Sequence, residues 1–166
     1  MFASITNIFT RSTSSSVLLV IGKFGATLNV LHLLPEDGTI ERFGLTSPNT
    51  TFRYRGAREQ AREEIGTVTL HVGDGETASS FLDDVETRIR KPWNDFLSSG
   101  PAQLQTGSVE MTQLVQGVLK PAALAAIHER EGRDRSMRAT QTYSVFVVSI
   151  TRPSGRSLTE LTSFPA

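Results

Sequence analysis

The hydrophobic period of this chain changes at Gly73-Asp74-Gly75, and this change limits the folds open to it. Before this turn, apolar and polar residues alternate, as in β-strands. After it, apolar residues recur at intervals of three and four, as on an amphipathic helix: Ala78, Phe81, Leu82, Val85 and Ile89. Because strands precede helices without βαβ alternation, we predict an α+β fold with an antiparallel sheet of five to seven strands packed by two helices.

Turn signals divide the strand region. Two strands joined by a GKFG turn are expected between Val17 and Leu34, and Pro35-Glu36-Asp37-Gly38 leads into a third. The charged residues 56–64 are expected to form a loop or a solvated helical turn. Residues 142–151 are β-branched and aromatic on both faces, which predicts a central strand.

The helical region contains its own start and stop signals. Thr77 can cap the first helix, and a second is expected to begin near residues 106–108 and to stop at Gly132. Pro121 is expected to kink or split this second helix. Residues 130–138 are polar and lack periodicity, which predicts a mobile surface loop.

The length of 166 residues suits one core, so we predict a single domain over residues 17–166 after a flexible N-terminal tail, residues 1–16. This tail has apolar residues at helical spacing that could dock onto a membrane or a neighbouring subunit: Phe2, Ile5, Ile8 and Phe9. An organelle-targeting segment is the alternative, because the first 35 residues contain no acidic side chain. No apolar run reaches the length of about 20 residues that a membrane-spanning helix needs.

The chain contains no cysteine, and its three histidines lie far apart in sequence. These facts exclude a disulfide framework and thiolate metal sites, and no HxH, HxxxH or HExxH spacing occurs. We therefore predict no metal, no cofactor and no catalytic residue. One enzymatic alternative uses His71 as general base beside Asp74 or Glu76, although His71 also fits a polar outward position on a strand. His32 is expected to be a partly buried residue bonded to the backbone.

Arginine dominates the 17 basic residues and occurs in three groups, while the net charge is zero. Because a guanidinium binds phosphate in a planar, bidentate way, these groups are candidates for lipid headgroups or RNA. The predicted anion-binding residues are Arg53, Arg55, Arg58, Arg88, Arg90, Arg133, Arg135 and Arg138. Local pairing with nearby glutamates is the alternative, and Arg62, Lys91 and Arg130 belong to the same groups.

The order of segments in the middle of the chain resembles a known family. The strand GTVTLHV leads through GDGET into the helix ASSFLDDVETRIRKPWNDFL, all after a short tail without acidic residues. This layout is similar to that of the matrix proteins of rhabdovirus-type negative-strand RNA viruses, especially the small plant-infecting ones. The resemblance implies a non-enzymatic viral protein that self-associates, coats the inner face of an envelope and condenses a nucleocapsid.

The sequence thus favours a structural or assembly protein that self-associates and binds an anionic membrane or a ribonucleoprotein, with no small-molecule substrate identified. The expected location is the cytoplasm, the periphery of a membrane or a virion. Two other classes stay open: an effector, adaptor or immunity-like module that binds a protein partner through residues 130–140, and the small enzyme built on His71.

Overall fold

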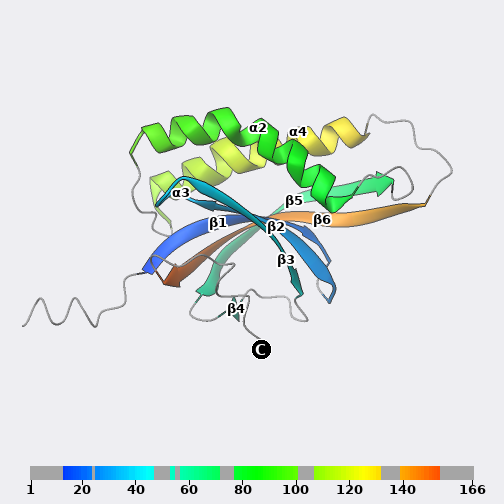
Figure 1. Cartoon of the computed structure of the whole chain (residues 1–166), viewed down its shortest axis with the longest axis horizontal. Coiled ribbons are helices and arrows are strands. Elements are labelled where there is room, and N and C mark those ends of the chain that lie inside the picture. The colour runs from blue at the N-terminus through cyan, green and yellow to red at the C-terminus, as the bar shows by residue number, and fades with distance from the viewer. Residues whose placement is uncertain are drawn as a thin grey trace, which may run out of the picture.

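The structure, a computed structural model, describes residues 13–23, 25–46, 53–54, 57–71, 77–100, 107–131 and 139–153, with positions 46, 53 and 54 described by their backbone alone. Six strands in these segments form one antiparallel sheet in the order β3-β2-β1-β6-β5-β4 (Figure 1). The strands are β1 Thr13–Gly22, β2 Thr27–Leu34, β3 Thr39–Thr46, β4 Arg53–Tyr54, β5 Ala57–His71 and β6 Thr140–Pro153. The central position of β6, between β1 and β5, is as predicted.

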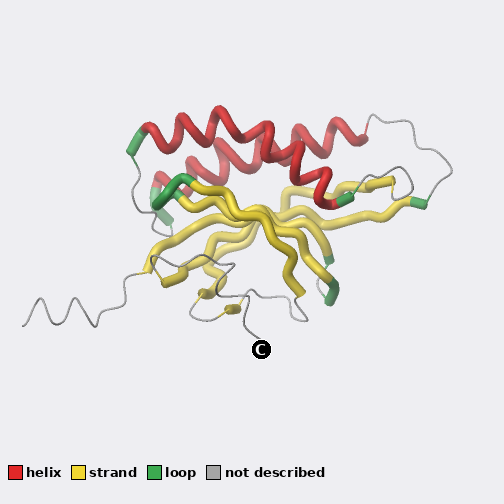
Figure 2. The backbone as a smooth tube through the Cα atoms, viewed as in Figure 1, coloured by secondary structure: helices red, strands yellow, loops and turns green. Residues whose placement is uncertain are grey.

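Two helical segments cover one face of the sheet (Figure 2). The first is α2, Ala78–Ser98. The second runs without a break through α3 Val109–Gln113, the π-helix η2 Leu114–Leu119 and α4 Lys120–Glu131. This arrangement confirms the predicted α+β single domain with an antiparallel sheet and two helices.

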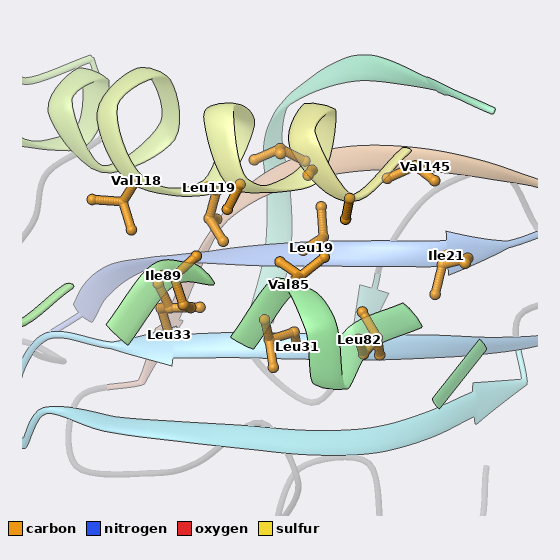
Figure 3. Close-up of a cluster of buried hydrophobic side chains, with 14 of the residues drawn as sticks. Leu19, Ile21, Leu31, Leu33, Leu82, Val85, Ile89, Val118, Leu119 and Val145 are labelled. Carbon is orange, nitrogen blue, oxygen red and sulfur yellow. The ribbon is translucent and has the colours of Figure 1, made fainter. Parts of the chain in front are cut away.

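The main core lies between the sheet and the helices (Figure 3). Alternate residues of the strands, such as Leu19 and Leu31, meet the apolar stripe of α2, including Val85 and Ile89. Leu119 extends the same core into the second helical segment, and all five side chains are fully buried. The period of two in the strands and of three to four in the helices therefore brings one apolar face of each layer together.

The opposite face of the sheet carries a second buried apolar cluster. Its members alternate with those of the main core along the strands: Leu18, Val20, Leu28, Val30, Leu45, Ala57, Phe146, Val148 and Ile150. Both faces of β1 and β6 are buried for this reason, as the uninterrupted apolar runs in their sequences indicate.

Caps and turns formed by neighbouring residues fix the ends of these elements. Thr77 Oγ1 accepts a hydrogen bond from Ser80 N over 3.1 Å, and Ser108 Oγ accepts one from Met111 N over the same distance. Gly38, at φ +75°, closes the turn between β2 and β3, and its amide donates to the Leu34 carbonyl over 2.9 Å. The helix start at Thr77, the start of the second helical segment at Ser108 and the turn at Gly38 are as predicted.

Prolines disturb the helices less than their sequence positions suggest. Pro92 lies inside α2, which continues to Ser98. Pro121 does not split the second helical segment. The π-helical turn η2 lies directly before the proline, and α4 continues past it to Glu131. A proline lacks the amide that the preceding turn would bond, and a wider turn accommodates the carbonyl that is left without this donor.

Two expected boundaries are wrong. Residues 57–64, expected as loop or helical turn, belong to β5, because they pair with β6 from Arg58 to Thr151 onward, with bulges at Glu59/Ala61 and Glu64/Gly66. The first strand begins at Thr13 and not at Val17, since its serines pair with the end of β6. In both cases a ladder with a distant strand overrides the polar local sequence.

Candidate functional site

Five polar side chains form a cluster on the face of the sheet opposite the helices; its centre is buried, while the side chains of Glu41 and Glu36 at its rim are 18% and 25% exposed. Ser16 comes from β1, His32 from β2, Glu41 from β3 and Arg152 from β6, while Glu36 lies in the turn between β2 and β3. Ser16, His32 and Arg152 have no exposed surface. The register explains the meeting, because His32 lies directly opposite Glu41 and diagonally beside Ser16 across the β1–β2 pair.

Hydrogen bonds of 2.6 to 3.3 Å connect the members of this buried polar cluster. His32 Nε2 lies 2.6 Å from Ser16 Oγ, and His32 Nδ1 lies 2.9 Å from Glu41 Oε2. Arg152 Nε donates to Ser16 Oγ over 3.3 Å, and Arg152 Nη2 donates to Glu36 Oε1 over 2.9 Å. Burial lowers the pKa of His32, and its bond to Glu41 acts in the opposite direction. At neutral pH the cluster therefore holds a neutral imidazole beside a paired arginine.

The hydrogen-bonded series Ser16, His32 and Glu41 has the composition of a catalytic triad: a nucleophile, its general base and the group that orients the base. Here, however, Ser16 Oγ lies in the middle of a strand, and neither it nor His32 is exposed to solvent. A reacting serine needs room for a substrate carbonyl and donors for its oxyanion, so this geometry ties strands together and does not present a nucleophile.

The sequence predicted only part of this cluster. His32 was expected to be partly buried and bonded to the backbone; instead it is fully buried and bonded to two side chains. Ser16 was assigned to the N-terminal tail, and Arg152 and Glu36 carried no signal. In the sequence, His32 alternates in phase with Leu28, Val30 and Leu34, and this shared strand face is the signal for its burial.

Most arginines in the described residues are already paired with acidic side chains. Arg88 bonds to Asp84 over 3.0 Å and to Glu129, and the bond to Glu129 is the first cause that raises its pKa. Arg130 lies at the end of α4, not in a loop as predicted, and it is buried against Asp84. Arg42, Arg62 and Arg152 have acidic partners too. Of the predicted group on α2, Arg88 is thus part of an ion-pair network between the helices.

Two of the predicted anion-binding residues differ from this pattern. Arg58 and Arg90 are exposed, and neither forms an ion pair within the described part of the chain. The register of β4 with β5 also places position 53 directly opposite Arg58, so two arginines occupy facing positions at the edge of the sheet. Two basic residues at facing register positions concentrate positive charge at one place along the sheet edge. We call this pair of positions the arginine corner.

A cleft of about 300 Å³ lies where the start of the second helical segment meets β5 and β6. Its apolar lining includes Met111, Val115 and Val147, and Thr112, Gln116 and Ser149 add polar groups. This volume is at the lower end for small-molecule pockets. No sequence signal marked these residues as neighbours.

The other candidates are only partly described. His71 is 8% exposed and not outward as expected, and its Nδ1 has no hydrogen-bond partner among the described residues. The predicted partners of His71, Asp74 and Glu76, lie outside those residues, as do Arg55, Arg133, Arg135 and Arg138, and the docking residues Phe2, Ile5, Ile8 and Phe9. Within the described segments, no cluster of His, Asp or Glu is arranged to hold a metal ion. Nor does any helix there have the length and apolar character to cross a bilayer.

The fold and these sites define a single α+β domain with a helix layer on one face of an open antiparallel sheet. Comparison with family models, with curated proteins and with solved structures gave no match.

Proposed function

We propose that this chain is a non-enzymatic assembly protein that self-associates and binds an anionic, phosphate-bearing surface, like the matrix proteins its layout resembles. The observation that carries the proposal is the arginine corner: Arg58 is exposed, lacks an ion pair in the described residues, and faces the position of Arg53 in the β4–β5 register. A phosphate bound at the exposed Arg58 would compensate its charge and accept bidentate hydrogen bonds from its guanidinium.

The pairing of the other arginines supports this location. Since Arg42, Arg62, Arg88, Arg130 and Arg152 have acidic partners, their charges are largely cancelled at short range. The net charge of zero means that attraction to a polyanion must be local. Arg90 is exposed, and Lys91, whose side chain is 89% exposed, forms only a surface ion pair of 3.6 Å with Asp95, so these two residues offer a second, weaker cationic position on α2.

The open edge of β5 supports self-association. In the described residues β4 pairs only with Ala57 and Arg58, so the outer edge of this 15-residue strand has no strand partner there from Glu59 to His71. Such an edge can pair with a strand of another chain. Its two bulges and its charged residues oppose indiscriminate pairing and would restrict it to a matching partner.

Binding is tested by titrating the full chain with phosphatidylserine vesicles, with neutral phosphatidylcholine vesicles and with single-stranded RNA across a salt series. Arg58→Gln should weaken binding to the preferred anion and reduce the salt slope by about one phosphate contact. Arg62→Gln is the matched control, because it removes the same charge from the same strand at a residue paired with Glu59. Equal effects of the two variants, or no salt-dependent binding of the wild type to any ligand, would refute the proposal.

Self-association is tested separately by light scattering over a protein concentration series. The proposal predicts that the mean mass rises with concentration in the absence of lipid and RNA. A strict monomer at all concentrations would leave no basis for an assembly role.

A further inference from the structure

The hydrogen bonds of the buried polar cluster have one consistent direction at neutral pH. A carboxylate only accepts hydrogen bonds, so His32 Nδ1 carries the proton that bonds Glu41 Oε2. His32 Nε2 is then an acceptor and receives the Ser16 hydroxyl proton. Ser16 Oγ in turn accepts from Arg152 Nε. In each of these three hydrogen bonds, one donor therefore meets one acceptor.

Protonation of His32 would disrupt this arrangement of donors and acceptors. Nε2 would become a donor that faces Ser16 Oγ, which already accepts from Arg152. The Ser16 hydroxyl proton would then have no acceptor among its described partners, at a residue with no exposed surface. The new positive charge would also lie in the same cluster as the Arg152 guanidinium, while Glu41 and Glu36 would partly offset it.

We propose that the buried polar cluster is a pH-sensitive lock on one end of the sheet: at neutral pH it holds β1, β2, β3 and β6 together, and protonation of His32 in mild acid loosens them. Among the described residues, the groups that face His32 are Ser16 from β1, Glu41 from β3, Arg152 from β6 and Glu36 from the β2–β3 turn. This inference does not depend on the proposed function.

The direction of the pH effect follows from burial. Burial lowers the pKa of His32 below its ordinary value of 6.5, which the unfolded chain retains. Below pH 6.5 the unfolded or opened state therefore binds more protons than the closed state. The stabilisation is complete above this pH and is lost as the pH falls toward the lower pKa of the closed state.

The first test observes His32 in the wild-type full chain by NMR of the imidazole nitrogens. The expected result is a neutral ring with its proton on Nδ1 at pH 7, which stays neutral below pH 6.5. Titration at the ordinary value, or a proton on Nε2 at neutral pH, would overturn the proposal. This measurement needs no variant.

The second test measures amide hydrogen exchange from pH 7 to pH 5, corrected for the intrinsic pH dependence of exchange. Protection of β1, β2 and β3 amides should fall about tenfold for each unit by which the pKa of His32 is lowered, while α2 amides such as Val85 keep theirs. His32→Gln should abolish this difference, and His128→Gln, at an exposed position of α4, should not. Equal loss in α2 and the strands, or no loss, would contradict a local lock.

Discussion

Arg130 Nη1 in α4 donates a hydrogen bond to Asp84 Oδ2 in α2 over 2.8 Å, and this ion pair joins the two helices at the outer layer of the domain. The Arg130 side chain is 5% exposed, and its guanidinium carbon lies 5.2 Å from the centre of the Phe81 ring. Asp84 also accepts from Arg88 Nε. Asp84 thus bonds to two cations, one of them buried, and Arg88 is also paired with Glu129.

Asp84→Asn should destabilise the fold by about 2–3 kcal/mol, because the buried Arg130 loses its charged bond to Asp84. Asp95→Asn is the control: it removes the same charge from the same helix at a side chain that is 70% exposed. That change should cost less than about 0.5 kcal/mol. Urea unfolding of the two variants measures the difference, and similar midpoints would show that the Asp84 network adds nothing.

Leu19→Ala should cost about 2–5 kcal/mol, since it opens a cavity between β1 and the helices at a side chain with no exposed surface. Val109→Ala provides the contrast, because Val109 is 69% exposed at the start of α3. Its effect should stay within about 0.5 kcal/mol. Thermal unfolding followed by circular dichroism is sufficient, and a mild effect at Leu19 would contradict the core assignment.

Two glycines should respond in opposite directions to alanine. Gly38→Ala should destabilise by about 1–2 kcal/mol, because φ is +75° there and the added Cβ would lie 3.2 Å from Leu97 Cδ1. Gly117→Ala should stabilise by about 0.5–1 kcal/mol, since it lies in a helical segment where a Cβ meets nothing within 4 Å. Denaturant midpoints that move in the same direction would be inconsistent with these backbone conformations.

Ser108→Ala should cost about 1 kcal/mol by removing the acceptor for the Met111 amide at the start of α3. Ser108→Asp should retain most of the stability, because its carboxylate can accept the same bond and favours a helix N-terminus. The contribution of the cap is measured by comparing the helical ellipticity and the unfolding midpoints of the two variants with those of the wild type. Equal losses for alanine and aspartate would mean that the cap contributes little.

Elements that depend on neighbouring residues could be predicted from the sequence, whereas contacts between distant segments could not. The first helix, its Thr77 cap and the turn at Gly38 were predicted correctly, since each depends on residues within a few positions of one another. The strand β5 was missed at residues 57–64, where charged residues hide a ladder that only β6 provides. Local signals are weak for a strand whose partner lies elsewhere.

The sequence by itself determined the class of fold, because the period of apolar residues decides which faces of strands and helices must be buried. Only the tertiary structure decided which charges are cancelled and which polar groups are buried together. Arg152 and Ser16 are separated by 136 positions, yet their side chains share a hydrogen bond. Such contacts follow from the register of the whole sheet, since it is the pairing of distant strands that brings their side chains within bonding distance.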